Sequence, residues 1–177
     1  MSQTATLYRV SQDTFEKLKA SSTSRRFDIA AAKNYTTFQG SFMGLEYLLS
    51  KGQDQQKTEL VSEIFNPKDA LGRQEFENLS TEEQFEFYES GSFIPYLDTA
   101  KVRRINDLLS QVTEADFQAS FDTKELNENG IYPKVWHNDD SPTKVFNLRH
   151  ITEDLAELKS IFQQASTDKD NLLVFVG

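Results

Sequence analysis

The sequence of 177 residues contains no cysteine. This absence excludes disulfide bonds, thiolate catalysis, zinc ribbons and iron–sulfur clusters together. Histidine is nearly absent as well, since His137 and His150 are the only two, and this scarcity limits metal ligation and acid–base chemistry. None of the seven glycines has the spacing of a phosphate-binding loop or a dinucleotide fingerprint. We therefore expect neither a cofactor nor a metal centre.

Long apolar runs and positive charge are also in short supply. The longest purely apolar run is Leu172–Val176, which is far too short to cross a bilayer. The first residues show no basic flank followed by an apolar stretch, so we expect no signal peptide and a cytoplasmic location. The formal net charge is −9. Nucleic acids and anionic membranes both require a basic surface, and we expect neither as a partner.

The chain does hold enough apolar bulk for a core, with 14 Phe, 6 Tyr and 1 Trp. A chain of this length buries about 70% of its unfolded surface on folding. Neither a shift in composition nor an internal repeat divides the sequence. These features predict a single domain over residues 1–177.

Local patterns predict helices between two terminal strands. The strands are expected at Leu7–Val10 and Leu172–Val176, where β-branched and aromatic residues concentrate. The longest helix is expected from Asn147 to Ala165, because its apolar residues recur at steps of three and four. Further helices are expected from residue 12 to about 20, over 40–51 and 81–90, and after Asp98, Thr113 and Asp122, while 60–65 suits a helical turn or a short strand. The pattern predicts a helix-rich α+β fold, with a small sheet that contains the N- and C-terminal strands.

Most candidate carboxylates are explained by helix capping. Ser80 with Glu83 has the spacing of a capping box, and Asp98, Asp116 and Asp122 occupy similar positions at the starts of predicted helices. His150 precedes Asp154 by four residues, so an i,i+4 contact on an exposed helix face accounts for it. These residues therefore indicate no catalytic site.

The segment from Tyr132 to Asp140 is the best sequence candidate for a functional surface. In one interpretation Tyr132 and Trp136 form the aromatic wall of a groove, with His137, Asp139 and Asp140 at its polar rim. In the other, Trp136 fills the edge of the core and its indole N–H donates to a backbone carbonyl. The polar residues also offer nitrogen and oxygen ligands, but their spacing is typical of a solvated loop.

The acidic-aromatic stretch, residues 74–91, has two interpretations. It contains six glutamates among four aromatic residues and has no lysine or arginine. An amphipathic surface helix would turn Phe85 and Tyr88 inward and leave the glutamates in water. Alternatively, exposed aromatic rings surrounded by carboxylates would form a recognition surface for a basic protein.

Several segments together resemble a known bacterial family. Lys124–Pro133 with the following Trp136 is similar to the signature of the YfbM-like family, whose function is unknown. The segments 7–11, 44–49 and 172–177 also fit its pattern. The resemblance implies a single compact α+β domain, with no established activity to transfer. Phe42, Met43 and Glu46 stand where the family pattern has Trp, Asp and His, which further disfavours an enzyme.

Two functions remain open at this point. The favoured one is a non-catalytic, cytoplasmic protein-binding module, of which an immunity- or antitoxin-type protein with an acidic surface for a basic partner is one form. The alternative is a small enzyme or small-ligand-binding protein with its site near Tyr132–Asp140.

Overall fold

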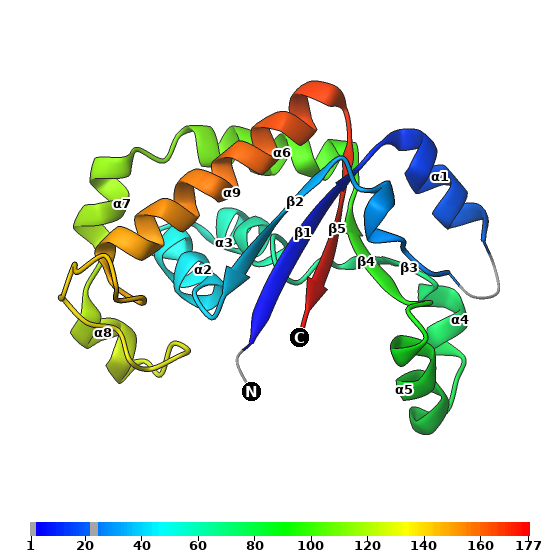
Figure 1. The fold of residues 1–177 in the computed structure, drawn as a ribbon, viewed down its shortest axis with the longest axis horizontal. Helices are drawn as coiled ribbons and strands as arrows, with labels where there is room; N and C mark the ends of the chain where they lie inside the picture. Colours follow the sequence, from blue (N-terminus) through cyan, green and yellow to red (C-terminus); the bar gives the residue numbers. More distant parts are fainter. Residues whose placement is uncertain (1–2, 22–24) are drawn as a thin grey trace.

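The computed structural model describes residues 3–21 and 25–177 (Figure 1). In this part of the chain, five strands form one antiparallel sheet in the order β2-β1-β5-β4-β3. The strands are β1 (Thr4–Val10), β2 (Asn34–Gln39), β3 (Asp69–Leu71), β4 (Ile94–Leu97) and β5 (Asn171–Val176). The helices are α1 (Gln12–Ala20), α2 (Phe42–Ser50), α3 (Gln55–Ser62), α4 (Arg73–Glu77), α5 (Thr81–Glu89), α6 (Thr99–Ser110), α7 (Glu114–Ser120), α8 (Thr123–Glu128) and α9 (Leu148–Asp168), with a 3-10 turn at Ile29–Ala31. The predicted α+β fold is confirmed.

The two terminal strands pair with each other at the centre of the sheet. Leu7 of β1 lies opposite Val174 of β5 in antiparallel register. Leu172 and Val174 of β5 face the larger core cluster, whereas Leu173 faces a smaller cluster on the other side. The apolar run of β5 is thus covered on both faces, as expected for a central strand without polar alternation.

Helices cover the two faces of the sheet unequally. Figure 1 shows α2, α3, α6, α7 and α9 gathered on one side, with α1, α4 and α5 on the other. The predicted stripe on α9 is confirmed, because its apolar residues are buried against side chains of β1, β2 and β5. Its members are Ile151, Leu155, Leu158, Phe162 and Ala165. Most of the core lies between this helical layer and the sheet.

Side-chain caps fix the starts of the predicted helices. The Asn147 side chain accepts from the backbone N–H of His150 at the start of α9, and Asp98 does the same for Lys101 at the start of α6. Ser80 and Glu83 form the complete capping box before α5. The caps at Thr113 and Asp122 are also present. In the described residues, no helix combines the length and apolar character needed to span a membrane.

Candidate functional site

Residues 132–140, predicted to form a functional surface, lie in the loop between α8 and α9. Trp136 is only 3% exposed, and its indole N–H donates to the carbonyl of Ile131 at 3.0 Å. The ring packs edge-on against Phe121 and Phe146, with centroid separations of 6.2 and 5.8 Å. Trp136 therefore fills the edge of the core rather than forming the wall of an open groove.

The polar residues of this loop are held by local hydrogen bonds. Nδ1 of His137 accepts from the backbone N–H of Asp139 at 3.3 Å. The Asp139 carboxylate accepts from the backbone N–H of Ser141, and this bond, with smaller contributions that include Lys144 3.5 Å away, lowers the Asp139 pKa. Asp140 is exposed. The structure thus brings His137 and Asp139 together, and their role in binding stays a prediction.

Tyr132 lies on the other side of the loop, towards the start of the chain. Its hydroxyl accepts from the backbone N–H of Gln3 at 3.3 Å, and the peptide bond to Pro133 is cis. Among the described residues, no group of three or more His, Cys, Asp or Glu side chains is placed to hold a metal ion.

A polar cluster of Ser41, His150 and Asp154 is enclosed between α2 and α9. Nδ1 of His150 accepts from the Phe146 backbone N–H at 3.0 Å, so the ring proton belongs on Nε2, which lies 3.6 Å from Oδ2 of Asp154. The i,i+4 pairing is as predicted, but the prediction of an exposed face is wrong. The two side chains are only 17% and 11% exposed, because this face of α9 turns towards α2.

Burial governs the chemistry of this cluster. Asp154 Oδ2 has no hydrogen-bond partner in the described part of the chain, and burial raises the pKa of Asp154. The Ser41 hydroxyl faces the carboxyl and partly offsets that rise, although it makes no hydrogen bond of ordinary geometry. The Asp154 carboxyl lies between the Ser41 hydroxyl and the His150 ring. A serine nucleophile instead requires histidine as its neighbour, so this arrangement does not suit acyl transfer.

The acidic-aromatic stretch forms an arm at the β3–β4 end of the sheet (Figure 1). It comprises α4 and α5, in which no residue is fully buried. Phe85 is 67% exposed and Tyr88 is 46% exposed, so the interpretation that turns both rings inward is wrong. Phe87 and Gln84 face inward instead: the Gln84 amide donates to the carbonyls of Phe76 and Leu79.

The arm is fastened to the rest of the domain at its base. The Arg25 guanidinium is buried and pairs with Glu75 of α4 at 3.1 Å. The Phe76 ring lies 4.6 Å from that of Phe93, between centroids. Gly72, with φ of 82°, precedes α4 where a β-carbon would lie 2.6 Å from the Ser92 carbonyl oxygen. These contacts fasten α4, and α5 packs on α4 through the rings of Phe76 and Phe87, whose centroids are 6.2 Å apart.

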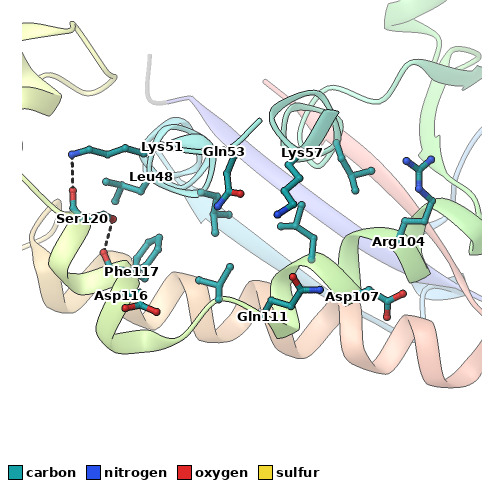
Figure 2. A pocket seen from close by; sticks show the side chains of 14 residues that line it. Leu48, Lys51, Gln53, Lys57, Arg104, Asp107, Gln111, Asp116, Phe117 and Ser120 are labelled. Atoms are coloured by element: carbon teal, nitrogen blue, oxygen red, sulfur yellow. Dashed lines mark hydrogen bonds between the residues drawn. The ribbon is translucent and has the colours of Figure 1, made fainter. Parts of the chain in front are cut away.

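A separate groove opens on the helical side of the domain (Figure 2). It has a volume of about 490 Å³ and lies between the α2–α3 pair and the α6–α7 pair. Leu48 and Phe117, both in the core, contribute to its floor, and Lys57 and Arg104 lie on its rim. No local sequence pattern predicts this site, because its residues come from four helices and the turns next to them, which only the fold brings together.

Comparison with known proteins supports the fold but supplies no activity. Residues 1–175 match a family described as a domain of unknown function (DUF1877). The chain is similar in structure to a protein of unknown function, YfbM from Escherichia coli, with a TM-score of 0.64, 16% sequence identity and full coverage of both chains. At this identity the likeness shows the fold alone. No curated protein matches the chain.

Proposed function

The chain belongs to the DUF1877 family, a domain family of unknown function, and from this premise we propose that it is a non-catalytic protein-binding module for a basic partner. The observation that carries the proposal is the outward face of α5. There Phe85, 67% exposed, is surrounded by glutamates that are also exposed.

Helical geometry places these groups on one surface. At roughly 100° per residue, Glu82, Phe85, Glu86 and Glu89 fall within an arc of about 100° around α5. We call these four residues the α5 face. Glu83 lies outside it and is occupied by the capping box. The face therefore combines one large apolar ring with three carboxylates.

This composition suits a protein interface. Burial of an exposed phenylalanine yields about 1.5–3 kcal/mol, and such aromatic residues are common at the centres of interfaces. Carboxylates around the ring would attract lysine and arginine side chains and reject acidic partners. The net charge of −9 also attracts basic proteins over distances longer than a direct contact.

The fixed base of the arm supports the proposal as well. The Arg25–Glu75 pair fastens α4, and the Gln84 amide joins α5 to α4 through the carbonyls of Phe76 and Leu79 before any partner arrives. A preformed surface loses less conformational entropy on binding than a flexible one. One concrete form of the module is an immunity- or antitoxin-type protein that neutralises a basic protein. We place it in the bacterial cytoplasm, where a chain without cysteine needs no oxidising compartment.

Co-purification from the native host tests this function. Tagged wild-type chain should retain a basic protein in a 1:1 ratio at low salt and release it at high salt. Replacement of Glu82, Glu86 and Glu89 by glutamine should abolish retention. The matched control replaces Glu16, Glu114 and Glu128, which are exposed on other helices, and should retain the partner. Absence of a stoichiometric partner at low salt, or equal retention by both triple variants, would refute the proposal.

A further inference from the structure

We propose that the groove between α2–α3 and α6–α7 is a second binding site, which takes a small amphipathic anion with a carboxylate head and an alkyl chain. This inference is independent of the α5 face, since the groove lies on the opposite side of the sheet (Figure 1).

The floor of the groove is apolar and mainly aliphatic. Its apolar lining comes from all four surrounding helices and the turn after α6, namely Leu48, Leu49, Leu60, Leu108, Val112 and Phe117. The volume of about 490 Å³ lies within the range of about 300–1,000 Å³ that is usual for small-molecule sites. Branched aliphatic side chains around such a space suit a flexible hydrocarbon chain.

Two cations lie at separate positions along the rim of the groove. In Figure 2 the Lys57 ammonium is directed from α3 into the middle of the groove, whereas the Arg104 guanidinium stands on α6 at the end opposite Lys51. Neither has a carboxylate within 4.0 Å among residues 3–21 and 25–177. The Lys57 ammonium, which has no anionic partner among the described residues, stands beside the apolar floor, and this position favours an anionic head group.

The third cation of the lining is already engaged. Lys51, at the far end in Figure 2, lies 2.5 Å from a carboxylate oxygen of Glu125 and donates to the Ser120 carbonyl at 3.2 Å. The ligand head is therefore placed at Lys57, with Arg104 farther along the rim, and its chain points towards Phe117.

The lining also contains two carboxylates, which should lower the affinity of the groove for an anion. Asp116 accepts from the Thr113 hydroxyl at 2.7 Å and is held at the start of α7. Asp107 lies one turn after Arg104 on α6, directed away from α3 in Figure 2. Its negative charge near the proposed head group should weaken binding of an anion. Removal of the Asp107 charge should therefore strengthen binding of the anion.

The chemistry of the lining disfavours a phosphate-rich ligand. Among the described residues of the lining, glycine is absent, so no glycine-rich loop offers its backbone N–H groups to a phosphate. The Lys57 ammonium offers hydrogen-bond donors to one carboxylate, and six of the fourteen lining residues supply apolar surface for a hydrocarbon chain. The lining therefore favours an alkyl carboxylate over a nucleotide as the ligand.

Isothermal titration of the full chain with decanoate, below its micelle concentration, tests the proposal. Decanoate should bind saturably in a 1:1 ratio. Decylamine, with the same chain and the opposite charge, should bind at least about tenfold more weakly, a difference of about 1.4 kcal/mol. Absence of saturable decanoate binding, or equal binding of both compounds, would overturn the proposal.

Variants on α3 and α6 locate the site. The double variant Lys57→Gln, Arg104→Gln should weaken decanoate binding about tenfold. Arg103→Gln, an exposed neighbour outside the groove, is the matched control and should bind as wild type. Asp107→Asn should tighten binding. An unchanged affinity in the double variant would show that decanoate binds elsewhere. Phe85→Ser should leave decanoate binding intact, which separates this site from the proposed partner surface.

Discussion

A β-carbon on Gly44 would lie 2.4 Å from Cη2 of Trp136. The indole ring therefore occupies the space that any other residue at position 44 would fill. This contact joins the middle of α2 to the loop before α9, and Ile151 of α9 closes the same space, 3.0 Å from that β-carbon position. The close approach explains why Gly44 stands inside a helix, where glycine costs about 1 kcal/mol relative to alanine.

Gly44→Ala is expected to destabilise the protein, although alanine is the better helix former. The added methyl must displace the ring, and overpacking of this kind costs about 1–3 kcal/mol. Chemical denaturation measures the loss. The second change Trp136→Phe should recover part of it by making room, and a Gly44→Ala variant more stable than wild type would contradict the packing described here.

Leu155→Ala should lower the free energy of unfolding by about 2–5 kcal/mol, because Leu155 is buried and truncation leaves a cavity. Glu157→Ala on the outer side of α9 is the control. It loses only an exposed hydrogen bond from Thr36 and should change stability by about 0.5 kcal/mol or less. Similar losses in both variants would mean that the buried face of α9 is assigned incorrectly.

Asp154 should make stability depend on pH in a defined direction. Burial raises its folded-state pKa, so its favourable contribution is complete below the pKa of the unfolded chain and is lost as the pH rises through the folded pKa. Asp154→Asn should therefore gain stability relative to wild type between acidic and neutral pH. Denaturation curves across this range measure the difference, with exposed Asp140→Asn as control. A difference that stays constant with pH would exclude the effect.

Two sets of variants test the Tyr132–Asp140 segment, one for a structural role of Trp136 and one for a binding role of the polar residues. Trp136→Ala should cost about 3–5 kcal/mol of stability, since the ring is buried. His137→Ala and Asp139→Ala should leave the melting temperature nearly unchanged. If the segment is a site, the polar variants lose partner or ligand binding at unchanged stability. Wild-type binding in both polar variants would remove the segment from consideration.

Features set by local sequence were predictable. The caps at Asn147, Ser80 and Asp98 depend on residues within one turn, and the α9 stripe needs only its own periodicity. The terminal strands were predicted from their apolar runs. By contrast, β2 alternates weakly and is mostly polar, and β4 contains Pro95. These strands exist because β1, β3 and β5 offer hydrogen-bonding edges, which no local pattern reveals.

Side-chain orientation on α5 was not predictable for a similar reason. Phe85, Phe87 and Tyr88 are spaced so that two different faces of the helix are apolar. The choice of the buried face depends on Phe93 and Arg25, which contact α4 and α5 from outside these two helices. The groove was missed because Lys57 and Arg104 lie on separate helices, and neither α3 nor α6 indicates the other as its neighbour.

The affinity of a purified partner for a charge-reversed α5 face tests the central claim most directly. Once the 1:1 partner is isolated, titration should show that Glu86→Lys weakens binding about tenfold or more, because an attraction becomes a repulsion. The control Glu114→Lys makes the same charge change on α7 and should bind as wild type. If both variants bind the partner with equal affinity, the α5 face is not the interface.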